Sequence, residues 1–181
     1  MRRSVAWLAA LIVSALIAFA YANTTDNQEA VARGSVVKLT VKGGHGSGVH
    51  IGGGYVLTAA HVAVNGELTA KLDDGEIRST TTLWINEDYD IALVKLDNFT
   101  GIAHSMLSCR VPAVHEPITA QGNPLDMENI TTRGWIAGAP LKIEKAWLSV
   151  VPMSIPLAGG MSGGGLFDQH GRLVGILVGA P

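Results

Sequence analysis

Three short segments of this sequence carry residues that together could form a serine nucleophile. His61 ends the segment TAAH, Asp90 lies in DYDIAL, and Ser162 is flanked by glycines in GGMSGGG. A serine hydroxyl is a weak nucleophile at neutral pH, so it needs an imidazole to accept its proton and a carboxylate to hold that imidazole in the correct tautomer. The sequence therefore predicts a triad in which Ser162 attacks, His61 acts as base and Asp90 orients His61.

Asp88 competes with Asp90 for the role of the acid. Asp90 directly precedes the apolar run Ile91 to Leu96, whereas Asp88 is two positions further away. A carboxylate at the end of a buried strand is costly unless donors bind it, and a histidine N–H is a natural donor. We therefore favour Asp90.

The glycines around Ser162 predict a site for negative charge. Glycine permits unusual backbone angles and close approach of a substrate to the main chain. The N–H groups of Gly160 and Ser162 could converge as an oxyanion hole, which in enzymes contributes about 3 to 4 kcal/mol per donor. A phosphate-binding loop is the rival interpretation, but no lysine follows and no helix signal comes next.

The elements that must position these residues are short β-branched runs separated by Gly, Asn, Asp and Pro clusters. This spacing is typical of an all-β barrel or sandwich. No segment after residue 30 has a convincing helical period. The expected strands are Val36 to Val41, Val49 to Ile51, Tyr55 to Leu57, Leu68 to Leu72, Thr80 to Ile85, Ile91 to Leu96, Ile118 to Ala120, Thr131 to Ile136, Trp147 to Val151, Gly165 to Phe167 and Leu173 to Val178.

The beginning of the chain has the pattern of an export signal. Arg2 and Arg3 precede an apolar run from Val5 to Phe19, followed by the small-x-small sequence AYA. This pattern predicts a secretory signal peptide cleaved after Ala22, and a periplasmic or secreted protein. If it is not cleaved, residues 5–22 are long enough to serve as a membrane anchor.

We accordingly expect five segments. They are a signal peptide or membrane anchor (1–22), a flexible leader (23–33), a first β-barrel (34–97), a connector (98–117) and a second β-barrel (118–181). The connector is expected where turn-forming residues gather and the polarity is mixed.

Charge and composition argue against nucleic acid, a disulfide and a metal ion. Removing Arg2 and Arg3 from the 13 basic residues leaves 11 against 15 acidic ones, a net charge of −4, with no basic stripe for nucleic acid. Cys109 is the single cysteine, so an internal disulfide is excluded. His45 and His50 flank Gly46 to Val49 but lack a third ligand, so we expect no metal and no cofactor.

Several further motifs carry a resemblance to a known family. They are Gly46-Ser47-Gly48-Val49, Gly122-Asn123-Pro124, the segment TRGWIAG at residues 132–138, and GRLVGI at residues 171–176. With the three segments above, the chain resembles the trypsin-like serine proteases of the chymotrypsin fold. Within them it is most similar to the bacterial periplasmic HtrA/Deg group, here without a PDZ domain. The resemblance implies two perpendicular antiparallel β-barrels with the triad between them.

The same resemblance implies a serine endopeptidase that cleaves unfolded or extended polypeptides through an acyl-enzyme. Ile155, Pro156 and Leu157 would line an apolar substrate pocket, and the strand through Leu177, Val178 and Gly179 would pair with the substrate backbone. Association of copies into a homo-oligomer is one candidate assembly.

The sequence also departs from the family pattern. Met161 stands where the family has Asp or Asn, and the chain stops at Pro181, where family members continue with another strand. We therefore expect an incomplete second barrel, whose edge is exposed or covered by another segment.

Two alternatives remain beside the enzyme interpretation. An inactive protease-like module that binds extended peptides would arise if the oxyanion loop were not formed. An α/β-hydrolase would fit the G-x-S-x-G segment at residues 160–164, but its histidine should follow the serine, and His61 precedes Ser162.

Overall fold

The first half of the chain forms a closed six-stranded barrel. The computed structural model describes residues 32, 34–64, 66–125 and 127–179. The barrel has the strand order β1-β2-β3-β6-β5-β4, with antiparallel neighbours. Its strands are β1 (Val36–Val41), β2 (Gly44–His50), β3 (Tyr55–Thr58), β4 (Thr69–Lys71), β5 (Ile77–Asn86) and β6 (Ile91–Leu96).

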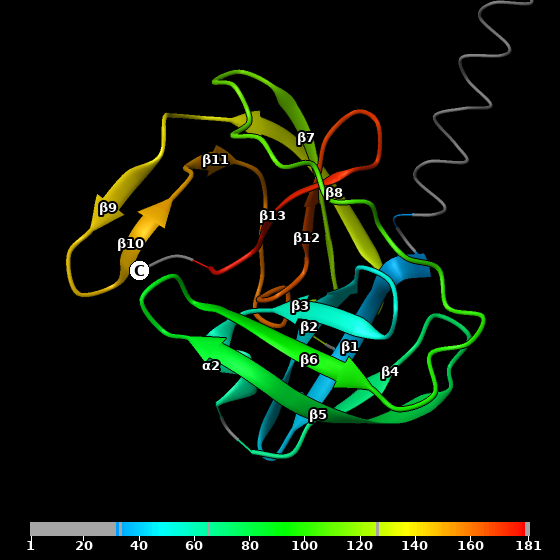
Figure 1. Cartoon of the computed structure of the whole chain (residues 1–181). Coiled ribbons are helices and arrows are strands. Elements are labelled where there is room, and N and C mark those ends of the chain that lie inside the picture. Colours follow the sequence, from blue (N-terminus) through cyan, green and yellow to red (C-terminus); the bar gives the residue numbers. More distant parts are fainter. Residues whose placement is uncertain (1–31, 33, 65, 126, 180–181) are drawn as a thin grey trace, which may run out of the picture.

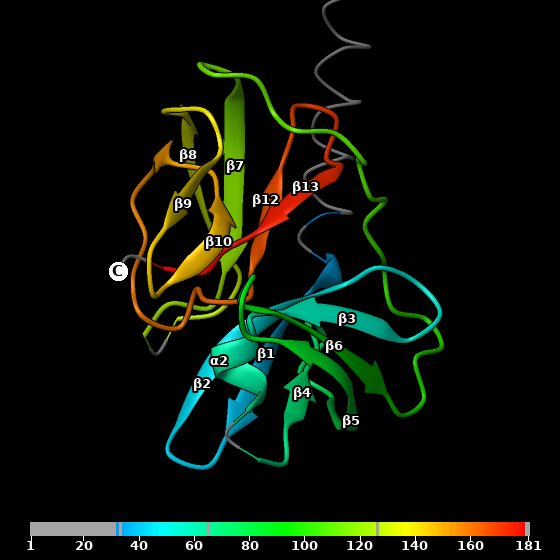
Figure 2. The same cartoon turned by 60° about the vertical axis from the view of Figure 1, so that its left-hand side comes forward.

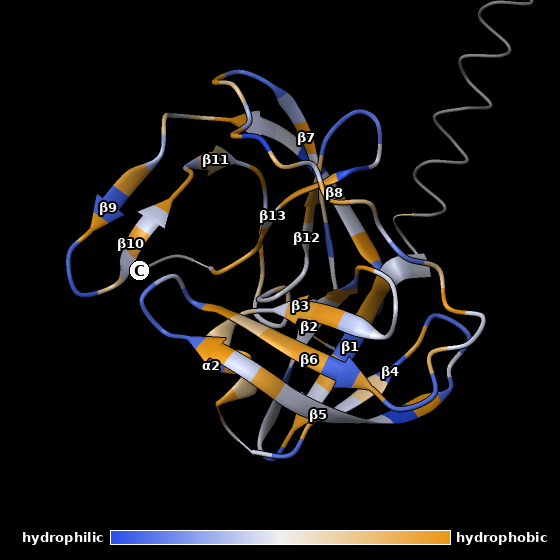
Figure 3. Ribbon diagram, viewed as in Figure 1, coloured by the Kyte–Doolittle hydropathy of each residue, from blue (hydrophilic) through white to orange (hydrophobic). Residues whose placement is uncertain are grey.

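Alternation of side chains along the strands builds the barrel core. In β6 the buried residues are Ala92, Val94 and Leu96, and the residues between them are only half-buried. Successive side chains of a strand point to opposite faces, so this alternation places one set inside the barrel. Figure 3 shows the hydrophobic colouring of β3 and β6 that accompanies it.

The second half forms an open five-stranded antiparallel sheet with an attached hairpin. The sheet has the order β11-β8-β7-β12-β13, and β9 pairs with β10 as a separate two-stranded sheet. The elements are β7 (Pro117–Gly122), β8 (Ile130–Ile136), β9 (Leu141–Ile143), β10 (Trp147–Val150), β11 (Met153–Ser154), β12 (Gly165–Phe167) and β13 (Leu173–Ile176).

The two lobes meet with their strands running in different directions. In Figure 1 the barrel lies below the sheet, and in Figure 2 the long strand β7 stands upright while β3 runs across beneath it. A third hydrophobic cluster joins the lobes, because Val36 and Val49 of the barrel pack with Phe167 and Leu173 of the sheet. The predicted all-β fold with two barrels and an incomplete second one is confirmed.

The edge of the open sheet at β13 is partly covered by the segment between the lobes. Leu107 forms a parallel bridge with Leu173, and the amide of Ser108 donates to the carbonyl of Leu173 at 2.8 Å. The amide of Leu173 in turn donates to the carbonyl of Met106 at 2.8 Å. Pairing of this kind satisfies backbone groups that an exposed edge would leave open.

The structure differs from the sequence-based expectation at several elements. The helix α2 (Ala60–Ala63) is a single turn, too short to produce a periodic pattern. Strand β2 begins at Gly44, ahead of the predicted Val49, because its glycines give no strand signal yet pair with β1 from Val41↔Gly44 onward. The short strands β9 and β11 were not predicted, since two or three residues are too few for alternation to be visible.

The expected export signal lies outside the described residues. Ala32, the one described residue of the expected leader, is buried against the cluster that joins the lobes. Within the described residues no helix has the length and apolar character needed to cross a membrane. The expected segment boundaries stay predictions.

Candidate active site

His61 lies where the last strand of a barrel hairpin turns into a helix. Strand β3 ends at Thr58, Ala59 is extended, and Ala60 begins α2. Ala60, Val62 and Ala63 are buried and hold the turn against the barrel, whereas the His61 side chain is 49% exposed. The small alanines let the helix turn pack closely while its histidine faces outward.

Asp90 holds His61 by two hydrogen bonds. Its Oδ2 lies 2.7 Å from His61 Nδ1, and its Oδ1 accepts the backbone N–H of His61 at 2.9 Å. Asp90 ends the turn between β5 and β6, has a positive φ of 51° and is only 7% exposed. One carboxylate therefore fixes both the ring and the main chain of the histidine.

This pairing changes the acidity of both groups. The hydrogen bond to Asp90 raises the pKa of His61 above its ordinary value, against the opposing effect of burial. Burial would raise the pKa of Asp90, but the hydrogen bonds from the ring and amide of His61 outweigh it and hold that pKa below its ordinary value. Asp90 is thus an ionised carboxylate at neutral pH that favours protonation of the imidazole.

Trp147 reaches the same carboxylate from the other lobe. Its indole Nε1 donates to Asp90 Oδ2 across 3.4 Å, and the adjacent amide of Leu148 donates to the carbonyl of Asp88 at 2.8 Å. The β9–β10 hairpin is therefore docked on the turn that carries Asp90. The sequence offered no signal for this contact, because a tryptophan between apolar residues is usually a core residue.

The loop that carries Ser162 is built from turns that leave two amides unused. The amide of Met161 donates to the carbonyl of Ala158 at 3.1 Å, with Gly160 at a φ of 94° between them. The amide of Gly163 donates to the carbonyl of Leu177 at 2.6 Å. Within the described part of the chain, the amides of Gly160 and Ser162 donate no hydrogen bond.

The loop lies against the barrel close to the turn of His61. The amide of Ser47 donates to the carbonyl of Ser162 at 2.7 Å. A Cβ atom at Gly46 would lie 2.6 Å from a methyl of Val62 and 3.0 Å from the carbonyl of Ser162, so only glycine fits between them.

Met161 is packed as a core residue. It is 2% exposed and belongs to the cluster formed by Ile118, Ala120, Ile136 and Leu166. The residue before Ser162 therefore stabilises the loop by apolar packing, since a thioether offers no ionic contact.

The residues expected to contact substrate are spread over different environments. Pro156 and Leu157 are exposed and Ile155 is half-buried. The side chain of Leu177 is 1% exposed and lies in the core of the second lobe. Its backbone N–H donates to the carbonyl of Gly164 at 2.9 Å and its carbonyl accepts the amide of Gly163 at 2.6 Å, so both backbone groups are used within the fold. Gly179 is exposed, and a Cβ there would lie 3.9 Å from Ser162 Oγ.

The two histidines considered as metal ligands have other partners. His45 Nε2 lies 3.0 Å from the carbonyl of Asn123. His50 is 2% exposed and bridges the carbonyl of Ala103 and the amide of Gly54, at 2.8 and 3.0 Å. Across the described residues, no group of three or more His, Cys, Asp or Glu side chains could hold a metal ion.

A closed barrel beside a sheet of a second barrel, with a histidine–aspartate pair on one and a glycine-flanked serine on the other, defines the trypsin-like class. The family model of the trypsin-like peptidase domain matches residues 46–176. The chain belongs to this family, as its motifs predicted.

Relatives and solved structures narrow the resemblance to the HtrA group. The chain is 31% identical over 140 residues to a serine protease HtrA-like of Staphylococcus epidermidis, covering 68% of this chain and 23% of that protein. It is 27% identical over 125 residues to a probable periplasmic serine endoprotease DegP-like of Pseudomonas putida, covering 68% and 26%. The chain thus spans about a quarter of the length of these curated relatives.

Two solved structures share the fold. The HtrA-type protease AlgW with tripeptide has a TM-score of 0.76 and 25% identity, over 84% of this chain and 53% of that chain. The Rv3671c protease in its inactive form has a TM-score of 0.76 and 21% identity, over 88% and 84%.

Proposed function

We propose that this domain is a serine endopeptidase that cleaves extended or unfolded polypeptides through an acyl-enzyme. Ser162 Oγ attacks the peptide carbonyl, His61 Nε2 accepts its proton, and Asp90 holds the ring and stabilises the imidazolium. The proton then passes from His61 to the leaving amine. Water attacks the acyl-enzyme in the second half of the reaction, and His61 serves again as base.

The observation that carries this proposal is the double hydrogen bond between Asp90 and His61. The carboxylate on Nδ1 directs the other ring nitrogen outward as a proton acceptor. The unused amides of Gly160 and Ser162 offer two donors for the oxyanion, beside the nucleophile.

Extended substrates are supported by the segment that follows β13 and passes the nucleophile. Gly179 lies beside Ser162 Oγ, and exposed Pro156 and Leu157 flank the loop on its approach. A peptide added along this backbone would gain main-chain hydrogen bonds without a requirement for sequence. The apolar character of residues 155–157 favours small or medium apolar side chains before the cleaved bond. The HtrA-type neighbour with a bound tripeptide supports the same class of substrate.

The site of action that we propose is outside the cytoplasm. The DegP-like relatives are named as periplasmic, and the first 22 residues have the pattern of an export signal. Mass measurement of the protein recovered from the periplasm tests this, because signal cleavage predicts a mature chain that starts at Asn23.

Covalent labelling tests the enzyme proposal. A fluorophosphonate probe should modify the protein at Ser162, and Ser162→Ala should abolish labelling while leaving the unfolding transition unchanged. A folded wild-type protein that binds an unfolded polypeptide but takes no label would instead establish the alternative, a peptide-binding module without activity.

A further inference from the structure

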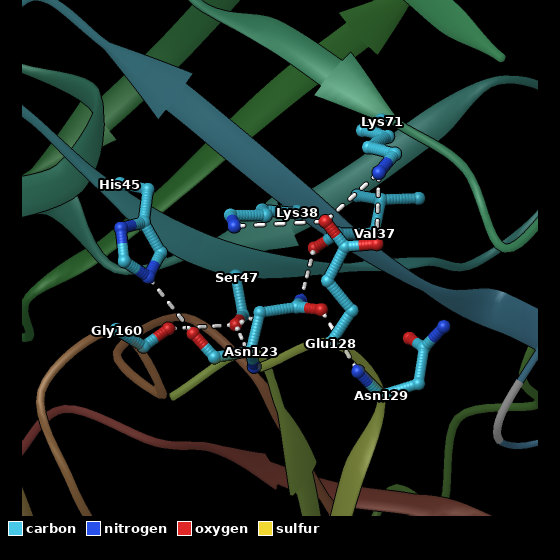
Figure 4. Close-up of polar contacts among 9 residues, drawn as sticks. All are labelled: Val37, Lys38, His45, Ser47, Lys71, Asn123, Glu128, Asn129 and Gly160. Carbon is cyan, nitrogen blue, oxygen red and sulfur yellow. Dashed lines mark hydrogen bonds and ion pairs between the residues drawn. The ribbon is translucent and has the colours of Figure 1, made fainter. Parts of the chain in front are cut away.

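Ser47 joins the two lobes directly beneath the loop of Ser162. It lies in β2 and is fully buried. Its Oγ donates to the carbonyl of Gly160 at 2.8 Å, and its backbone N–H donates to the carbonyl of Ser162 at 2.7 Å. One residue of the barrel therefore holds the carbonyls on both sides of Met161. Figure 4 shows the contacts of its hydroxyl.

Asn123 fixes the direction in which the Ser47 hydroxyl donates. The backbone N–H and side-chain Nδ2 of Asn123 both donate to Ser47 Oγ, at 2.8 and 3.1 Å. A hydroxyl has one hydrogen and two lone pairs, so these two bonds use its acceptor capacity. The remaining O–H is directed to Gly160, as the dashed lines in Figure 4 indicate.

Asn123 is itself held in one orientation. It is 1% exposed, and its Oδ1 accepts the amide of Asn129 at 3.0 Å. Its Nδ2 also donates to the carbonyl of Val37 in the barrel at 3.2 Å. The amide therefore cannot flip without the loss of buried hydrogen bonds.

The Ser162 loop depends on such external contacts. Met161, the residue before the nucleophile, is buried and apolar and can provide no ionic anchor. Gly160 fits tightly between the His45 ring and the carbonyl of Asn123, where a Cβ would collide with both. The carbonyl of Gly160, and with it the plane of the following peptide, is thus oriented by Ser47.

We propose that Ser47, locked by Asn123, is the positioning residue that holds the oxyanion-binding amides of Gly160 and Ser162 in their working orientation. The proposal rests on the proposed function of Ser162 as nucleophile. Oxyanion donors contribute only when they are preorganised, and a misplacement of about 1 Å can cost about 100-fold in rate. The contact between the two lobes at Ser47 therefore orients the oxyanion-binding amides in addition to stabilising the fold.

The variant Ser47→Ala tests this, with Ser35→Ala as its matched control. Ser35 is equally buried, and its Oγ donates to the carbonyl of Ala32 at 2.6 Å and lies 2.6 Å from Ser105 Oγ. Both variants should lose comparable stability. We expect Ser47→Ala to lower kcat about 10- to 100-fold with KM changed by less than about threefold, and Ser35→Ala to leave both unchanged.

Hydrogen exchange of the loop supplies a readout that does not need activity. The amides of Met161, Gly163 and Gly164 are hydrogen-bonded within or beside the loop, and they should exchange faster in Ser47→Ala than in Ser35→Ala. If Ser47→Ala does not fold, Ser47→Cys keeps a side-chain donor, although a weaker one on a larger atom, and should show changes in the same direction.

The results of these experiments distinguish a failure of the Ser47 proposal from a failure of the proposed function. Unchanged exchange in a folded Ser47 variant overturns the anchoring, whatever the activity. Faster exchange with the wild-type kcat overturns the positioning role. A wild-type protein without Ser162-dependent labelling overturns both the proposed function and the catalytic role of Ser47.

Discussion

Asp90 makes two hydrogen bonds to His61: its Oδ2 lies 2.7 Å from the ring Nδ1, and its Oδ1 accepts the backbone N–H at 2.9 Å. The carboxylate therefore sets the tautomer of the ring and the position of the helix turn that carries it. Its own backbone has a positive φ of 51°, which for a residue other than glycine is an uncommon conformation maintained by surrounding contacts.

The variant Asp90→Asn should keep the fold but remove most of the activity. The amide can still accept the backbone N–H of His61, but it does not stabilise the imidazolium and can favour the wrong tautomer, so we expect kcat to fall about 10⁴-fold. The carboxylate raises the pKa of His61, and activity needs the neutral imidazole. The rising limb of the residual kcat/KM should therefore shift to lower pH. An unchanged limb, measured with a small ester substrate, would contradict this assignment.

Replacement of Trp147 by Phe isolates the contribution of the indole N–H to Asp90. The ring volume is largely kept, while the donor at 3.4 Å from Oδ2 is lost. At about 1 kcal/mol for so long a hydrogen bond, we expect a loss of about fivefold in kcat/KM. Trp135→Phe is the matched control, because Trp135 is 51% exposed on β8 and should have no effect. Equal activities of the two variants would show that the indole does not contribute.

Alanine at Gly163 should disrupt the site far more than alanine at Gly75. Both glycines have a positive φ, 82° and 87°, so both substitutions introduce a backbone strain of about 1 to 2 kcal/mol. A Cβ at Gly163 would also collide with Ser47, Thr58 and Ala59, whereas nothing lies within 4 Å at Gly75. Urea unfolding should show a substantially larger loss of stability for Gly163→Ala, together with lost labelling of Ser162. Similar losses for both variants would mean that the loop can move away from the barrel.

Acid should weaken the first barrel through His50. Burial lowers the pKa of His50 below 6.5, helped by the charges of His104 and Lys95, while the backbone contact to Ala103 acts in the opposite direction. The unfolded chain then binds more protons at His50 than the folded one, so the contribution of His50 to the free energy of unfolding should decrease as pH falls below about 6.5. Urea titrations at several pH values between 7.5 and 5 measure this dependence.

The variant His50→Gln identifies the source of that pH dependence. Glutamine can keep a donor for Ala103 and an acceptor for Gly54 but does not titrate, so its stability should vary less with pH. His170→Gln, at an exposed position, should retain the wild-type dependence. Parallel curves for wild type and His50→Gln would exclude His50 as the source.

The sequence predicted the parts of the fold that depend on local pattern. The run Ile91 to Leu96 alternates into a buried and a half-buried set, and it forms β6 as expected. The glycine-rich start of β2 was missed, because glycine has no strand propensity of its own. Its glycines are needed for tertiary reasons: Gly46 makes room for Val62 and the Ser162 carbonyl, and Gly48 for Val56.

By itself the sequence determined the family and the all-β class, and it predicted the roles of His61, Asp90 and Ser162, because each of these residues lies in a short motif with its own turn. Only the tertiary structure decided what surrounds them. Trp147 contacts Asp90 across 57 positions, and Asn123 contacts Ser47 across 76. Such contacts form only when two separately built lobes dock, and spacing along the chain carries no information about which side chains that docking brings together.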